Sequence, residues 1–415
     1  MNGFRKFGYI LAFLSPLLGE TDLVSIAGIK IPALTTILFF IAAFILSRRK
    51  QFVFLFSNRL FNAALLYFVI ILFNYAFVLH NLFFKASEEL TPLWISIFRR
   101  MITVLFIFFA FRDVQQGIRL FHFYCAGLVL SSLSAYPEMF LLKHTLFNAS
   151  ITEGNEGYQR AIGFFTNPND FALTTVVALV FVFNYYLFTR SKFLLILSIL
   201  LIPPVFLSFS RNGLACLFIT LFLTFNVGKK VKWKTVLYIL FSFLSLCFII
   251  YSVPSIRERV LLLFSGDDSS AIGRMIVIYT AFQKWLTMPL LGIGVYFSPL
   301  LMEGFGNSGL VITIHNFYAH ALLETGVIGF SIVLWFLICF YKSIRKVFRS
   351  QPPATELFIY SKAALITLLV TCFYIFSGNH ILFEFFWYMV GVQLVILRAE
   401  YKRIKQTPKN LYAYA

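Results

Sequence analysis

The sequence is poor in charged residues, since Lys, Arg, Asp and Glu make up 13% of its 415 positions. Soluble globular proteins keep about a quarter of their residues charged, so this composition excludes an ordinary cytosolic enzyme. Apolar residues reach 60%, with 54 Phe, and the mean hydropathy is +0.84. Because one span uses roughly 20 apolar residues, this content can supply about ten to twelve spans. The chain is therefore an integral membrane protein with little left for a soluble domain.

Cysteine is also scarce. The five cysteines lie in apolar runs at unrelated spacings, which argues against a disulfide framework or a metal cluster and favours apolar packing; they are Cys125, Cys216, Cys247, Cys339 and Cys372. An Asp-rich metal-binding motif is absent as well, so we expect neither a metal nor a cofactor. The first apolar run follows Arg5 and Lys6, as in a signal peptide, but no small-residue cleavage site follows it. We expect it to be a retained span.

Apolar runs between polar interruptions predict about twelve transmembrane helices. They fall at about 7–26, 31–46, 60–79, 92–111, 120–141, 171–188, 193–209, 212–227, 235–253, 316–341, 357–377 and 381–397. The expected fold is thus an all-α integral membrane protein, with residues 1–415 forming a single polytopic domain. Arg99 and Arg100 fall inside the fourth run, where they mark either its outer end or a polar cavity.

The 35 Lys and Arg against 17 Asp and Glu give a net charge of +18. With a cytoplasmic amino terminus, most basic residues fall on the inner side and most acidic residues on the outer side, as the positive-inside rule requires. Basic runs such as 228–234 are therefore interpreted as topology signals before lipid or nucleic-acid contacts. The outer side then keeps two long segments, a smaller one at 142–170 and a large one at 254–315 between the ninth and tenth spans.

Two arginines lie at outer turns. Arg160 precedes Asn167-Pro-Asn-Asp, a helix-entry signal in which Asn169 or Asp170 is a plausible N-cap; the simplest interpretation is only that cap. Arg211 lies in the tight turn that joins two apolar runs. A guanidinium there is costly unless it meets a polar cavity or an anion, although the side chain can also extend to lipid headgroups.

A third arginine, Arg274, begins a stretch in which apolar residues recur at helical spacing through Trp285. This pattern predicts an amphipathic helix, which is either part of a site or a plain interfacial anchor. The Gly292-Ile-Gly294 pair that follows is weak support for a phosphate loop.

The most distinctive cluster opens the tenth predicted span. On a helix, Asn316, His320 and Glu324 share one face at four-residue spacing, and His315 stands at the mouth. Glu324 would lie about 13 Å below His315 along the helix axis, so it needs a partner or a wet cavity. The alternative for His315 is a satisfied helix cap.

Two further features lie near the outer side. Gly326 and Gly329 would permit close helix packing. The turn Ser377-Gly378-Asn379-His380 would add polar contacts to the same cavity or serve as an ordinary tight turn.

Arginine suits the bidentate binding of a diphosphate, and histidine suits general-base catalysis near neutral pH. Three arginines and one histidine are predicted on one membrane face. They describe a site that holds a diphosphate leaving group while a hydroxyl is activated, with arginines in place of a divalent ion.

The sequence resembles the O-antigen ligase and O-antigen polymerase superfamily of bacterial polytopic glycosyltransferases over residues 120–395. His315-Asn316, nine residues and then Gly326-Val-Ile-Gly329 resemble the family pattern His-Asn-x9-Gly-x-x-Gly. Other recurrent stretches of the family are matched by Arg160 with Gly163 and Asn167-Pro168-Asn169, by Ser210-Arg211 with Gly213, and by Arg274 followed by Pro289 and Gly292-Ile-Gly294.

The resemblance implies metal-independent, inverting transfer of a glycan from undecaprenyl diphosphate to an acceptor hydroxyl, at the periplasmic face of the bacterial inner membrane. His315 would activate the hydroxyl and Arg211 and Arg274 would bind the diphosphate. Arg160 would also contact the substrate, and the supporting residues would be Asn316, His320 and Glu324. The partners would be the lipid-linked donor, membrane lipids and an acceptor, with no nucleic acid.

The acceptor separates two branches of the family. A ligase uses lipid A core, and a polymerase of O-antigen or exopolysaccharide uses a second lipid-linked glycan. The His-Asn motif with its preceding Arg274 helix favours the ligase, although polymerases share much of it. A transporter or flippase for a lipid-linked sugar is the alternative from another class; it would need polar residues near mid-membrane and paired broken helices. A non-catalytic assembly partner is a third possibility.

Overall fold

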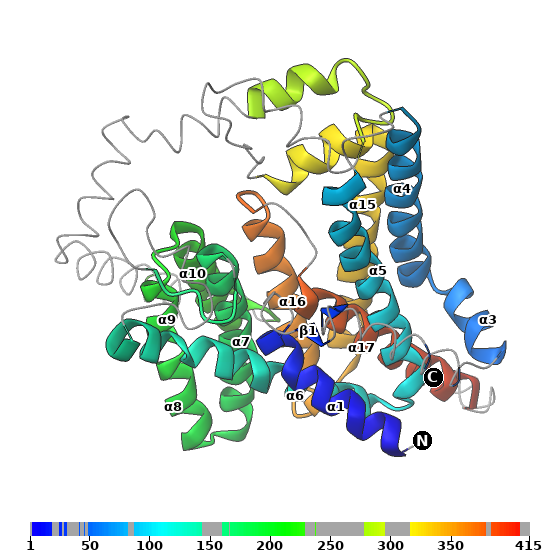
Figure 1. Ribbon diagram of the computed structural model, residues 1–415. Coiled ribbons are helices and arrows are strands. Elements are labelled where there is room, and N and C mark those ends of the chain that lie inside the picture. Colours follow the sequence, from blue (N-terminus) through cyan, green and yellow to red (C-terminus); the bar gives the residue numbers. More distant parts are fainter. Residues whose placement is uncertain are drawn as a thin grey trace.

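The chain folds into a bundle of α-helices (Figure 1). The computed structural model describes residues 2–18, 25–26, 29–30, 41, 45, 49–81, 87–142, 160–165, 167–228, 237, 278–294, 316–378 and 383–406. The longer helices are α1 (Asn2–Leu18), α3 (Arg49–Ser57), α4 (Arg59–Asn81), α5 (Ser87–Ala110), α6 (Val114–Leu133), α7 (Pro168–Thr189), α8 (Lys192–Leu200), α10 (Arg211–Asn226), α15 (Phe317–Ser350), α16 (Glu356–Tyr374) and α17 (Glu384–Gln406).

Shorter elements join these helices. A π-helix, η1 (Pro137–Leu142), extends α6, and α9 (Ile202–Leu207) extends α8. Residues 278–285 form a further short helix. Two-residue strands β1 (Ser25–Ile26) and β2 (Ile29–Lys30) pair in antiparallel fashion.

The predicted all-α class and the multi-pass character are confirmed. Among the described residues, four helices are long and apolar enough to cross a membrane, and the pair α3 and α4, bent by 80°, makes a fifth candidate. The predicted run at 193–209 is divided at Leu201 into α8 and α9. Because Pro203 and Pro204 lack the amide N–H that a helix interior needs, the division falls just before them. Nearly all of the predicted span 235–253 and most of 31–46 lie outside the described residues, so the count of twelve stays a prediction.

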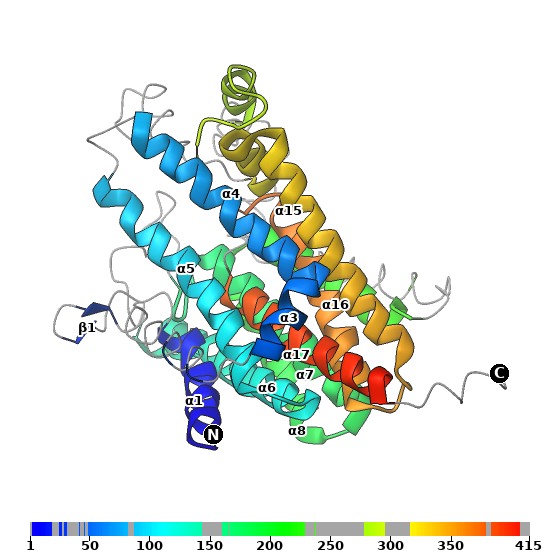
Figure 2. The same ribbon diagram turned by 90° about the vertical axis from the view of Figure 1, so that its right-hand side faces the viewer.

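Aromatic rings fill the interior of the bundle. Figure 2 shows α4 beside α15 and α5 beside α17. Where α4, α15 and α17 meet, the rings of Tyr67, Phe336 and Trp387 stack with centroids 5.5–6.1 Å apart. Lipid tails are as apolar as these side chains, so close packing and ring contacts stabilise the helix pairs here, rather than the exclusion of water.

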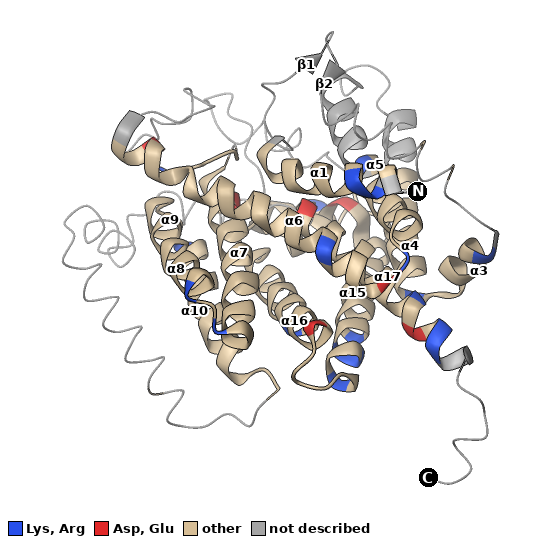
Figure 3. Ribbon diagram, turned by 90° about the horizontal axis from the view of Figure 1, so that it is seen from below, with Lys and Arg blue, Asp and Glu red and all other residues tan. Residues whose placement is uncertain are grey.

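One end of the bundle, named here the basic end, collects positive charge. Arg398 of α17 donates to the carbonyl of Phe108 at 2.7 Å and to that of Phe111, and Arg5 of α1 donates to Ala110 at 3.3 Å. These carbonyls end α5, where a helix leaves acceptors unpaired and its dipole favours cations. Figure 3 shows more basic residues on the last turns of α15 and α17.

The opposite end is named the site end. The first turns of α7, α10 and α15 meet there with the last turn of α16, joined by the hydrogen bonds described below. Candidate residues from distant parts of the sequence therefore lie close together.

Candidate active site

The arginine cluster, defined as Arg160 and Arg211 with their backbone supports, joins two of the predicted motifs. Arg160 Nε donates to the Ser208 carbonyl at 2.9 Å, and its Nη2 lies 3.5 Å from Asn169 Oδ1. The next residue, Ala161, donates its N–H to the Leu207 carbonyl at 2.9 Å. The turn before α7 is thus fastened to the turn before α10.

The two guanidinium groups lie near each other. Burial lowers the pKa of the Arg160 guanidinium, and the positive charge of Arg211 lowers it further. Arg160 is half-buried, whereas Arg211, the first residue of α10, is exposed. Two cations held together at a helix N-terminus form an arrangement that a bound anion would stabilise.

The helix entry beside this cluster differs from the prediction. The N-cap of α7 is Asn167, whose side chain accepts from the N–H of Asn169 at 2.8 Å, so the expectation of Asn169 or Asp170 is wrong. Pro168 occupies the first helical position, where a residue without an N–H is best tolerated. Because Asn167 caps the helix, the side chain of Asn169 does not serve as the cap, and its Oδ1 lies beside the Arg160 guanidinium.

A buried carboxylate supports the same turn. Glu138 of η1 is fully buried, and its Oε2 accepts from the N–H groups of Ile162 and Gly163 at 3.3 and 3.0 Å. Gly163 has φ +56°, and a Cβ there would come within 2.8 Å of the Phe171 ring. Sequence reasoning missed the role of Glu138, although a carboxylate inside an apolar run was a signal.

The turn carrying Arg211 is also closely fixed. Ser210 caps α10 by accepting from the N–H of Gly213 at 3.0 Å, and Phe209 adopts a left-handed φ of 50°. A Cβ on Gly213 would lie 2.4 Å from that of Ala172, so α10 and α7 touch at this glycine. The glycine permits the approach that holds the two arginine-bearing turns together.

The His-Asn segment opens α15 at the same end. Asn316 is the N-cap and accepts from the N–H of Ala319 at 3.0 Å. His320 Nε2 lies 2.7 Å from Glu324 Oε1, so the predicted four-residue spacing brings these two side chains into contact. Their exposed fractions are 22% and 8%. The pair supplies the partner that the carboxylate of Glu324 was expected to need.

The helix α15 is broken at Gly326, which has φ 62° and ψ −171°. In Figure 1 the part before the break runs across the site end, and the part after it runs beside α4. The helix Phe317–Ser350 is long and apolar enough to cross a membrane, as the span predicted over 316–341 requires, but it is interrupted, and Glu324 lies just before the interruption.

Residues 289–294 fill this break. The N–H groups of Ile293 and Gly294 donate to the carbonyls of Leu323 and Glu324 at 2.9 and 3.0 Å. In return, the N–H groups after Gly326 donate to carbonyls before Ile293, with Val327 bonded to Pro289 at 2.9 Å and Ile328 bonded to Leu290 at 3.2 Å. We name residues 289–294 and 323–328 the glycine interlock.

Glycines make this contact possible. Gly292 and Gly294 have φ values of 74° and 104°. A Cβ on Gly292 would lie 2.5 Å from the backbone of Glu324, and one on Gly326 would overlap the Leu290 carbonyl. The predicted Gly-Ile-Gly stretch therefore serves backbone contact.

The helix at 278–285 lies against the crossing part of α15 (Figure 1). Ala281 and Leu323 are buried together, with Trp285, Ile293 and Ala319 packed around them. Trp285 Nε1 also donates to the Pro289 carbonyl at 3.1 Å. The described part of the predicted amphipathic helix is confirmed as helical.

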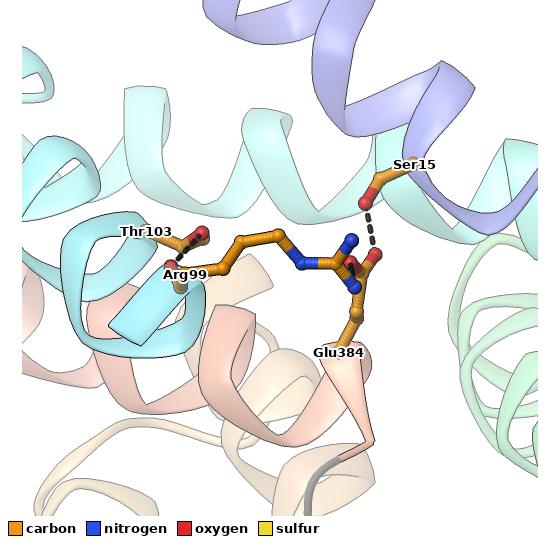
Figure 4. A network of polar contacts seen from close by, with 4 residues as sticks. All are labelled: Ser15, Arg99, Thr103 and Glu384. Atoms are coloured by element: carbon orange, nitrogen blue, oxygen red, sulfur yellow. Dashed lines mark hydrogen bonds and ion pairs between the residues drawn. The ribbon is translucent and has the colours of Figure 1, made fainter. Parts of the chain in front are cut away.

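Arg99 forms a separate polar cluster (Figure 4). Its Nη2 lies 2.7 Å from Glu384 Oε1 at the start of α17, and Ser15 of α1 donates to the same carboxylate. The side chains of Arg99 and Glu384 are 12% and 14% exposed. An arginine inside an apolar helix thus has the carboxylate partner that its burial requires.

Four of the singled-out residues lie outside the described part of the chain. They are Arg274, His315, Asn379 and His380. Arg160, Arg211, Asn316, His320 and Glu324 all lie at the site end.

Residues 171–334 match a family model described as O-antigen ligase. The matched range begins at α7 and contains Arg211, Arg274, His315 and the glycine interlock. A search of curated proteins finds none that matches the chain.

Proposed function

We propose that the chain, whose residues 171–334 match the O-antigen ligase family model, is a member of the O-antigen ligase and polymerase superfamily and transfers a glycan from undecaprenyl diphosphate to lipid A core. The reaction would proceed with inversion and without a metal ion. The observation that carries the proposal is the arginine cluster, because two neighbouring guanidinium groups at the start of α10 suit a diphosphate.

In this mechanism the arginines act on the leaving group. Arg211, exposed at the start of α10, binds the diphosphate together with Arg274, and the half-buried Arg160 adds a further positive charge beside the turn that carries Arg211. The positive charge stabilises the diphosphate as the glycosidic bond breaks. The N-terminal dipole of α10 acts in the same sense.

His315 acts on the acceptor. As general base it takes the proton of the acceptor hydroxyl, whose oxygen attacks the anomeric carbon from the side opposite the diphosphate. Asn316 caps the helix that follows, and His320 with Glu324 fixes the next turn. These three residues support the entry of α15, and His315 directly precedes Asn316 in the sequence.

The proposed topology places both termini in the cytoplasm and the site end in the periplasm, within the bacterial inner membrane. Arg5, Arg398 and the basic last turns of α15 share the basic end, which supports this orientation through the positive-inside rule.

The break in α15 invites comparison with transporters, whose discontinuous helices offer free backbone groups to ions and substrates. Here the carbonyls of Leu323 and Glu324 already accept from Ile293 and Gly294. The break is therefore filled by the protein, and this favours an enzyme over a transporter.

Activity in membranes tests the proposal. With a lipid-linked donor and a lipid A core acceptor, Arg211→Ala and His315→Ala should each abolish glycan transfer while the protein still reaches the membrane. Lys192→Ala, an exposed basic residue at the start of α8, is the matched control and should keep full activity. Full activity in both site variants would refute the proposal.

A deletion strain separates the ligase from a polymerase. Loss of all long chains from the core, with lipid-linked polymer accumulating, is the result expected of a ligase on a lipopolysaccharide gel. A core that carries one repeat unit would instead assign the chain to the polymerase branch.

A further inference from the structure

The last turn of α16 connects the two parts of the candidate site. A helix leaves its last carbonyls without intrahelical partners, and here three of them accept from other segments. The carbonyl of Cys372 accepts from the Tyr318 hydroxyl, that of Tyr374 from Asn212 Nδ2 and that of Ile375 from the Phe317 N–H, each at 2.9 Å.

These donors come from both functional segments. Asn212 directly follows Arg211, and Phe317 lies two residues after His315. We name the carbonyls of Cys372, Tyr374 and Ile375, together with the Tyr374 hydroxyl, the hub on α16. The hub therefore ties the proposed diphosphate-binding residue to the entry of the helix that follows the proposed base.

Tyr374 makes a further connection through its side chain. Its hydroxyl donates to Asp170 Oδ1 at 2.8 Å, in the first turn of α7. Asp170 follows Asn169, which lies beside Arg160. Tyr374 thus contacts the start of α10 through its carbonyl and the start of α7 through its hydroxyl.

The ring of Tyr374 is held in place. It is 1% exposed, and its centroid lies 5.7 Å from that of Phe383 in an edge-on contact. A Cβ on Gly378 would come within 2.6 Å of the ring, so the turn after α16 closes over it. A closely packed ring keeps its hydroxyl directed at Asp170.

We propose that Tyr374 is a positioning residue for glycan transfer: it fastens α7 and α10 to the end of α16, whose Cys372 and Ile375 carbonyls hold α15, and so it helps to set the distance between the diphosphate and the acceptor base. This inference rests on the proposed function. The physical reason is that a donor and a base held in reactive geometry lower the barrier, and a small displacement between them is costly.

Tyr374→Phe is the central test because it removes one hydroxyl and keeps the ring. The expected result is a fall in kcat of about tenfold with donor KM changed by less than about twofold, since Arg211 remains in place. Tyr136→Phe is the matched control. It removes a tyrosine hydroxyl that donates to the Leu200 carbonyl at 2.7 Å, away from the hub, and should leave kcat unchanged.

Tyr318→Phe approaches the same hub from α15 and covers the case in which Tyr374→Phe does not reach the membrane. It removes the bond to the Cys372 carbonyl and should also lower kcat at constant donor KM. The thermal midpoints of all variants should be measured in parallel. A role in stability alone would lower the midpoint without lowering kcat.

The outcomes separate the two proposals. If Arg211→Ala is inactive while both hub variants behave as Tyr136→Phe does, the positioning role is overturned and the proposed function stands. A change confined to donor KM in Tyr374→Phe would also overturn the positioning role. Full activity in Arg211→Ala and His315→Ala would overturn both.

Discussion

The arginine cluster and the glycine interlock lie at the same end of the bundle but are built differently. The cluster is held largely through a side chain, with the guanidinium of Arg160 bonded to the Ser208 carbonyl and to Asn169, beside one backbone bond from Ala161 to Leu207. The interlock is held by backbone groups, with four N–H donors and four carbonyls exchanged between residues 289–294 and 323–328. A side-chain contact can be weakened in steps, whereas a backbone contact between glycines tolerates almost no added atom.

Gly326→Ala should produce the largest effect. A non-glycine residue in this conformation costs about 1–3 kcal/mol, and the new methyl group would overlap the Leu290 carbonyl. We expect a severe loss of both folded protein in the membrane and activity, measured by yield and by glycan transfer. Gly117→Ala in α6 is the control, since a Cβ there meets only ordinary contacts starting at 3.4 Å. Normal yield and activity in Gly326→Ala would show that the interlock is dispensable.

An intermediate effect is expected at the arginine cluster. Inorganic pyrophosphate should raise the thermal midpoint of the purified protein by roughly 2 °C, because an anion relieves the repulsion between Arg160 and Arg211. Arg160→Gln should weaken this rise and leave the yield largely intact. Lys192→Gln should keep the full rise. An equal rise of the thermal midpoint in the unchanged protein, Arg160→Gln and Lys192→Gln would mean that pyrophosphate binds elsewhere. Loss of this rise at high salt would agree with charge pairing between pyrophosphate and the arginines.

The smallest effect is expected from Glu324→Gln. The amide keeps a hydrogen bond to His320, but a bond without charge is about half as strong, and the Glu324 carbonyl that the interlock uses is unchanged. Activity should fall by about two- to threefold at normal yield. A loss of yield as severe as that expected for Gly326→Ala would contradict the division between side-chain and backbone support.

The two regions also differ in how far the sequence predicted them. Arg160 and Arg211 stand out because a charged residue beside an apolar run needs a partner, and that rule holds without knowledge of the fold. The boundaries of α4, α7, α10 and α16 followed from the lengths of the apolar runs, which can also be measured without knowledge of the fold. The cap at Asn167 was missed because Asn167, Asn169 and Asp170 are all suitable N-cap residues and lie within four positions. Only the local backbone geometry selects one of them.

The interlock was not predictable in this way. Gly326 lies in an apolar run, where a glycine is typical of close helix packing, and its left-handed φ depends on a partner more than thirty residues earlier in the chain. The hub on α16 was equally unpredictable, because three of its acceptors are backbone carbonyls. Every residue has a carbonyl, so the sequence does not show which ones accept a bond from another segment. The proposed roles of His315 and Arg274 remain predictions from the family resemblance.

The filled break in α15 has a consequence for the order of membrane insertion. A helix that stops and restarts in lipid leaves backbone groups without partners, at a cost of several kcal/mol for each group. Residues 289–294 precede α15 in the chain and are therefore synthesised first. On the proposed topology, residues 289–294 have already reached the periplasmic side when α15 is inserted. The segment that bonds to the break is therefore present on the side where the break forms. Biogenesis of this helix thus depends on the segment before it, and a shortened chain that begins at α15 should insert poorly.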